Sequence, residues 1–169
     1  MVRRFLRRVP DSFFGVRWAN TQAMCTQFKA DIMNGLHAFG ASVVRAATTK
    51  DAYKAALYLV SATRGAGDTV YSATGEVSGT GYTAGGVAVT TGTAPSTSGT
   101  TAFFTPSASI VYTTVTLATA FDAMLLYNDT SATKLAVAVF TFGSQTVTSG
   151  TFTLTMPAND ASTGLIRIA

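Results

Sequence analysis

From residue 54 to the C-terminus, the chain is a succession of short runs rich in Val, Ile, Thr, Phe and Tyr that Gly, Ser and Pro clusters interrupt. β-Branched and aromatic residues favour strands, and the interruptions favour turns. The pattern predicts eight strands without intervening helices, over residues 53–62, 87–91, 101–105, 110–118, 123–128, 135–143, 151–156 and 165–168. We therefore expect a mainly β fold, an antiparallel β-sandwich that is jelly-roll-like, and not a parallel α/β sheet.

Alternation within these runs predicts which side chains face the core. Val111, Val115 and Leu117 have the spacing of one strand face. Four further side chains are expected in the sandwich core: Leu57, Leu59, Val137 and Val139. Tyr58 and Ala138 would then lie on the opposite face, because successive side chains of a strand alternate.

The segment before the strands has a different period. Between residues 21 and 39, apolar side chains recur every three or four positions and form one stripe of an amphipathic helix: Met24, Phe28, Ile32, Leu36 and Phe39. Three parts follow from this reading, a basic and flexible N-terminal extension (1–18), a helical segment with its connector (19–50) and a β-sandwich domain (51–169).

Charge is scarce and unevenly placed. Charged residues make up 12% of the chain, against about 25% in an average protein. The net charge of +4 comes from the first 17 residues, where five arginines face one aspartate, and the remainder is balanced. The cluster indicates either docking onto nucleic acid or an acidic partner surface, or a solvated extension that precedes the folded part. The N-terminus lacks the apolar region of a signal peptide, and no apolar run is long enough to span a bilayer, so we expect no membrane association.

The residue types that usually carry chemistry are nearly missing. The chain has one histidine, His37, one cysteine, Cys25, and one glutamate, Glu76, and its aspartates are scattered singly. No arrangement of nucleophile and base, paired carboxylates or metal ligands follows from this set. We expect no enzymatic activity, catalytic residue, metal or cofactor, and no part for these three residues in assembly.

Two stretches, residues 64–86 and 91–100, are too rich in Gly, Ser and Thr to form a core. We expect both to be long surface loops, which either bind a partner or line an assembly interface. The glycines within 79–86 do not match a dinucleotide-binding loop, because a strand-like run follows them where a helix is required.

Several stretches carry a resemblance to a known family. They are AMCTQFKADIMNGLHAFG, YKAALYLVSAT, TGEVSGTGYTAGG, LAVAVFTFGSQTV and MPANDASTGLIRIA. From about residue 19 onward, the chain resembles small structural proteins that tailed bacteriophages encode. The basic residues before it depart from the family's pattern, and we expect them to be an extension.

The resemblance implies a component of the virion, assembled in the host cytoplasm, with the major capsid protein or other virion proteins as partners. We expect a homo-oligomer that acts as a capsid decoration or cement protein and binds no specific nucleic acid. A tail or head–tail junction component is the alternative within this class, and a module that binds host carbohydrate is the alternative outside it. The candidate assembly contacts are Met24, Phe28, Met33, Leu36, Val70, Tyr71 and Tyr82.

Overall fold

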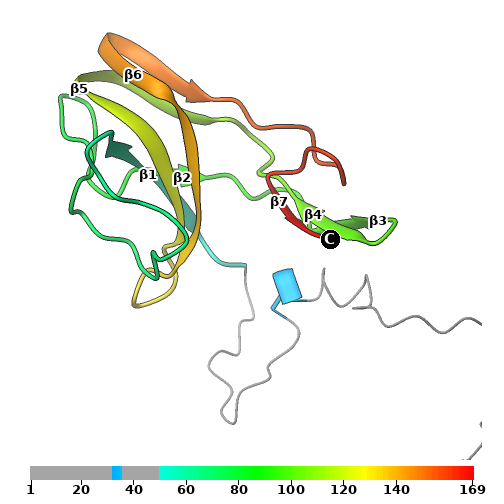
Figure 1. Cartoon of the computed structure of the whole chain (residues 1–169). Coiled ribbons are helices and arrows are strands. Elements are labelled where there is room, and N and C mark those ends of the chain that lie inside the picture. The colour runs from blue at the N-terminus through cyan, green and yellow to red at the C-terminus, as the bar shows by residue number, and fades with distance from the viewer. Residues whose placement is uncertain (1–31, 36–49) are drawn as a thin grey trace, which may run out of the picture.

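The chain is mainly β, as the sequence predicts. A computed structural model of the protein describes residues 32–35 and 50–169 (Figure 1). Its strands form two antiparallel sheets, a larger one in the order β2-β1-β5-β6 and a smaller one in the order β3-β4-β7. The strands are β1 (Tyr53–Leu59), β2 (Val87–Val89), β3 (Ser96–Ser98), β4 (Thr101–Phe104), β5 (Ile110–Asn128), β6 (Ala136–Leu154) and β7 (Ile166–Ile168).

The N-terminal helix falls largely outside the described residues. Residues 32–35 form one helical turn, in which the Gly35 amide donates a hydrogen bond to the Ile32 carbonyl (3.0 Å). The extension over 1–18 lies outside the described residues, as do Met24, Phe28 and Leu36. The extension and the amphipathic helix therefore stay predictions.

The hairpin of β5 and β6 is the largest element of the fold. Each strand has 19 residues, and the two pair antiparallel between Ile110 with Leu154 and Tyr127 with Ala136. The sequence pattern predicts four shorter strands here, and that division is wrong. Both strands continue through the polar positions because irregular pairing, and not a turn, accommodates them.

Register shifts within the hairpin change which side chains face inward. The pairing shifts between Tyr112 and Val115, where Thr114 takes a positive φ of 54°. A bulge of this kind moves the side chains beyond it to the opposite face of the strand. Tyr112 and Val115 are therefore both buried, whereas Val111 is 39% exposed. The prediction that Val111 shares a core face with Val115 and Leu117 is wrong for this reason.

The bent hairpin closes over its own inner face. The Tyr112 hydroxyl, near the start of β5, donates a hydrogen bond to the carbonyl of Ala55 in β1 (2.7 Å). Phe142 and Phe152, from opposite halves of β6, have ring centroids 5.4 Å apart, and Phe121 lies edge-on to Phe152 at 5.0 Å. Aromatic contacts of this type stabilise a core beyond the burial of their area. The inner core therefore joins β1 to both halves of the hairpin.

Strand β1 is buried on both of its faces. Ala55 and Leu57 belong to the inner core, and Ala56 and Tyr58 belong to a second cluster on the other face. All four have an exposed fraction of 0%. β1 is thus a central strand, covered on one side by the hairpin and on the other by a different segment.

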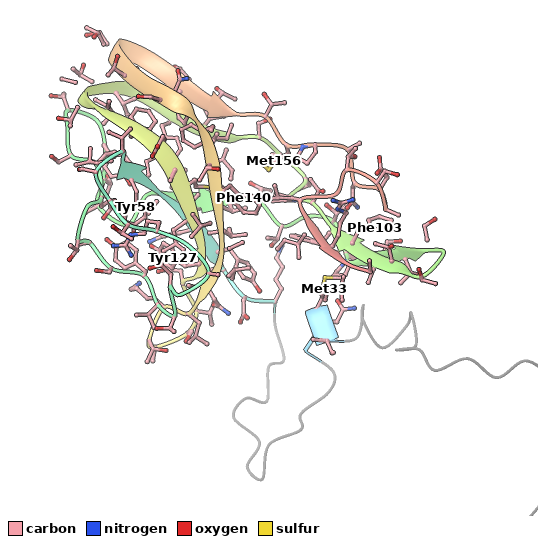
Figure 2. All side chains as sticks on the ribbon, viewed as in Figure 1. Met33, Tyr58, Phe103, Tyr127, Phe140 and Met156 are labelled. Carbon is pink, nitrogen blue, oxygen red and sulfur yellow. The ribbon has the colours of Figure 1, made fainter. Side chains whose placement is uncertain are left out.

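That segment is 60–86, which covers the second cluster. The Tyr71 ring packs against this cluster and stacks on the Tyr127 ring, with the centroids 4.8 Å apart. Val77 is buried against the inner core. Figure 2 marks Tyr58 and Tyr127, which come from the two strands beneath this cover. The expectation of a loop over 64–86 is confirmed, since no named strand lies there, but Val77 and Gly85 are buried, so the loop also covers part of the core.

The small sheet contains the C-terminus and lies beside the main sheet (Figure 1). Ile166 of β7 packs against the inner core, and the Leu165 amide donates a hydrogen bond to the Thr105 hydroxyl (2.9 Å). β3 lies within 91–100, so the expectation of a loop is wrong for residues 96–98. Pairing with β4 makes this strand, and its polar residues give no apolar alternation from which it could be predicted.

The core predictions for β1 and β6 have different outcomes. Leu57 is buried, as predicted, whereas Val137 is 43% exposed and that prediction is wrong. Val137 lies where the pairing of β6 shifts next to Leu126 and Tyr127, on the edge strand of the sheet. Tyr58 is fully buried although it faces away from Leu57, because segment 60–86 covers that face.

We expect Leu57→Ala to lower the free energy of unfolding by roughly 2–5 kcal/mol, since it leaves a cavity in the inner core. Val137→Ala, at an exposed position of a strand, serves as the matched control and should cost less than about 1 kcal/mol. Urea denaturation of both variants measures the two costs. Equal costs would contradict the described arrangement of β1 and β6.

Candidate assembly surface

The described residues hold little that suggests a chemical site. Within residues 32–35 and 50–169, no three His, Cys, Asp or Glu side chains gather in a way that could hold a metal ion. In the same part of the chain, no helix has the length and hydropathy needed to cross a bilayer. Two features remain, a carboxylate at the centre of segment 60–86 and the outer edge of β6.

The Glu76 carboxylate accepts three short hydrogen bonds. Oε1 accepts from the Tyr82 hydroxyl (2.7 Å) and from the Gly85 amide (2.7 Å), and Oε2 accepts from the Tyr71 hydroxyl (2.6 Å). Hydrogen bonds to an ionised acceptor are roughly twice as strong as those between neutral groups. Glu76 therefore fixes three parts of segment 60–86 relative to one another.

The same residues close the edge of β1. β2 pairs with β1 only as far as Ala55. Beyond it, the Leu57 amide donates to the Tyr82 hydroxyl (3.0 Å), and the Leu57 carbonyl accepts from the Val77 amide (3.0 Å). Tyr58 and Glu76 form an isolated bridge. The chain around Glu76 thus supplies the backbone partners that β2 is too short to provide.

Arg64 anchors the other end of this segment. Its guanidinium donates to Asp68 Oδ1 (2.9 Å) and to the Thr74 carbonyl (2.6 Å), and it lies 4.4 Å from the centre of the Tyr58 ring. Nine-tenths of the side chain is buried. A cation over an aromatic face is favourable, and more so when it is shielded from water. Arg64 is therefore part of the cover and is not a free cation.

Burial raises the pKa of the tyrosines around these contacts. It raises the pKa of Tyr58 and of Tyr127 to about 12. It also raises the pKa of Tyr71, Tyr82 and Tyr112, and for Tyr71 and Tyr82 the hydrogen bond to Glu76 acts in the same direction. The phenols stay protonated, so they can keep donating their hydrogen bonds.

The outer edge of β6 is the second feature. β6 lies at the margin of the main sheet, and none of its 19 residues is charged. One end of this edge is paired, because Val70 and Leu135 form a bridge just before the strand begins. Within the described residues, no other strand pairs with the outer side of β6. Leu135, at 50%, and Val137 are among the most exposed large apolar side chains.

Two grooves flank this edge. One, of about 390 Å³, is lined by Arg64, Asp68, Leu125, Val137, Val139 and Thr141, among others. The other, of about 620 Å³, has Met33, Phe104, Leu126, Val137 and Ile166 in its lining. Val137 lines both grooves, so the start of β6 lies between them.

The structure places the predicted contact residues in different settings. Tyr71 and Tyr82 meet at Glu76, inside the chain's own fold. Val70 is 37% exposed at the start of the β6 edge, and Met33 lines the larger groove. The structure thus brings Tyr71 and Tyr82 together and leaves Met33 apart from them, and their part in assembly stays a prediction. The β6 edge was not among these residues, although its lack of charge is visible in the sequence.

Similarity to known proteins adds no assignment. No family model matches the chain, and neither the curated proteins nor the solved structures contain a significant match.

We expect Glu76→Gln to lower the free energy of unfolding by about 2–4 kcal/mol. The amide nitrogen of glutamine cannot accept a hydrogen bond, so one of the part-buried donors loses its acceptor, and the remaining bonds lose their ionic character. Chemical denaturation measures the loss.

Asp122→Asn is a matched control, because it makes the same chemical change on β5 at a half-buried carboxylate away from this cluster. Its effect should stay below about 1 kcal/mol. Tyr82→Phe should lower stability in the same direction as Glu76→Gln, since the Leu57 amide loses its acceptor. A stable Glu76→Gln variant would show that the cover does not depend on this carboxylate.

A second prediction concerns alkaline pH. Tyrosine ionises near pH 10 in the unfolded chain, whereas Tyr58 and Tyr127 do so at about 12 in the folded chain. The stabilisation is present below pH 10 and is lost as the pH rises from 10 towards 12. We expect the melting temperature to fall over this interval and tyrosinate absorbance to rise together with unfolding. Titration of all six tyrosines near pH 10 in a folded protein would contradict the described burial.

Proposed function

We propose that the chain is a non-enzymatic structural protein of a bacteriophage virion, and that it acts as a capsid decoration or cement protein on the lattice of the major capsid protein. The resemblance of the sequence to small phage structural proteins supports the proposal that the chain belongs to a phage virion. The observation that carries the assembly role is the open edge of β6, a 19-residue strand without charge.

The physical argument concerns what an assembly protein needs. A lattice protein gains free energy from buried apolar area and paired strands, repeated at each symmetry-related position. Burying unpaired charges opposes such contacts by several kcal/mol each. A charge-poor chain with exposed Leu135 and Val137 beside an open strand edge suits this role. In this proposal the two sheets are the layers of the sandwich expected from the sequence.

The charges of the described part favour a protein partner over nucleic acid. Three of the five cations there form ion pairs, Lys54 and Lys134 with Asp129 and Arg64 with Asp68. The other two, Lys50 and Arg167, donate to backbone carbonyls. Paired cations contribute little to binding phosphates, which requires a basic surface. We accordingly propose protein partners within the virion.

The environment of the tyrosines weighs against a carbohydrate-binding module. Sugar platforms need aromatic rings that are open to solvent. In segment 60–86, Tyr71 stacks on Tyr127 and Tyr82 stacks on Tyr112, and both hydroxyls are used by Glu76. The tail or head–tail junction remains the alternative location within the virion.

The test is quantitative mass spectrometry of purified particles of a phage that encodes the chain. We expect on the order of hundreds of copies in each particle, because a decoration protein follows the symmetry of the capsid lattice. About six or twelve copies would place the protein in the tail or at the junction and overturn the decoration role. Absence from particles that are otherwise complete would overturn the virion proposal.

A further inference from the structure

We propose that the outer edge of β6, over residues 138–142, pairs antiparallel with the same edge of a second copy of this chain, so that the two main sheets become one. The inference deepens the proposed function and rests on it for the particle in which the pair assembles. The partner is thereby defined as a second copy, and the contact as a backbone ladder centred on Phe140.

The edge already accepts a strand at one end. The Tyr71 amide donates to the Lys134 carbonyl (2.8 Å), and the Ala136 amide donates to the Thr69 carbonyl (3.0 Å). These two bonds belong to the isolated bridge between Val70 and Leu135, and among the described residues the pairing on this edge ends there. From Ala138 to Thr141, β6 pairs with β5 without a register shift, so this stretch of the edge is regular.

The stretch lacks the features that protect natural edge strands. Such strands usually carry lysine, proline or a bulge that prevents pairing with another chain. Between residues 137 and 143, β6 has no charge and no proline, and the pairing shifts lie on either side of Ala138–Thr141. An open and regular edge of this kind is suited to pairing with another strand.

Its composition favours a second copy as the occupant. In a twofold pair of antiparallel strands, each side chain faces one from the same strand. Because β6 contains only uncharged side chains, no like charges oppose each other in this arrangement. The exposed side chain of Val137 would also be covered.

The other edge of the sheet explains why the contact closes as a pair. That edge is β2, which has only three residues. A head-to-tail contact between β6 and β2 would give too few rungs to compete with pairing between two copies of β6. A twofold contact uses the β6 edge of both copies, so neither copy has a β6 edge left for a third chain.

The test is the self-association of the full-length protein, measured by sedimentation together with amide hydrogen exchange. We expect a dimer whose exchange from residues 138–142 slows as the concentration rises. Thr141→Lys should weaken dimerisation at least about tenfold, because the two copies of Thr141 lie about 7–8 Å apart as diagonal neighbours. Mixing it with Thr141→Glu should restore the pair.

Thr113→Lys is the matched control, because it makes the same change at an exposed position of β5. It should leave dimerisation within about twofold of the wild type, and melting curves should show that both variants fold. Equal weakening by the two lysines would overturn the proposal, and so would dimers that survive Thr141→Lys unchanged.

A monomer in which residues 138–142 are already protected would overturn the inference, because another part of the chain would then cover the edge. A monomer that pairs only with capsid protein would overturn the second copy as the partner while supporting the proposed function. A dimer that depends on Thr141 in a protein absent from virions would support this inference and overturn the proposed function. The two failures are therefore distinguishable.

Discussion

The free edge of β1 is the constraint on which the rest of the structure depends. A strand buried on both faces must also satisfy its backbone groups, since an unpaired amide or carbonyl in a core costs as much as a lost hydrogen bond. β2 provides partners only as far as Ala55. The backbone around Glu76 and the hydroxyl of Tyr82 provide the others. The carboxylate of Glu76 holds these partners in place through three hydrogen bonds, so one side chain supports the cover on the far face of the sheet.

This requirement gives the stretch TGEVSGTGYTAGG a physical explanation. Glu76 supplies the acceptor, and Tyr82 and Gly85 supply two of its donors. Gly86 has a positive φ of 74°, and a Cβ atom there would lie 1.7 Å from the Ala55 carbonyl oxygen. Only glycine fits where the chain passes so close to another backbone. The segment is a loop without a strand of its own, but Glu76, Val77 and Tyr82 supply the partners that a neighbouring strand would give to β1.

Core positions that follow from the pattern of apolar residues can be predicted from the sequence. Positions that are fixed by polar contacts or by irregular strand pairing cannot. Leu57 is correctly predicted in the core because it lies in a continuous apolar run, and β1 is buried on both of its faces. Val111 is wrongly predicted because of the bulge at Thr114, which has a positive φ. Beyond this bulge, the side chains that face the core change from even-numbered to odd-numbered positions of β5, and nothing in the local pattern marks it. The cover over residues 60–86 could not be predicted, since hydrogen bonds to Glu76 connect positions that share no period. The edge position of β6 follows from the strand order, which depends on contacts between distant residues.

The two edges of the main sheet differ in a way that concerns function. At β1 and β2, the chain uses Glu76, Tyr82 and two glycines to close an edge that lies next to the core. At β6, the longer edge, it uses a single bridge between Val70 and Leu135 and no charged residue within the strand. Leaving a regular stretch of edge such as Ala138–Thr141 unprotected exposes a protein to uncontrolled association, which selection normally opposes. One edge of the sheet is closed and the other is open. This difference is best explained if a partner chain covers the β6 edge when the protein acts.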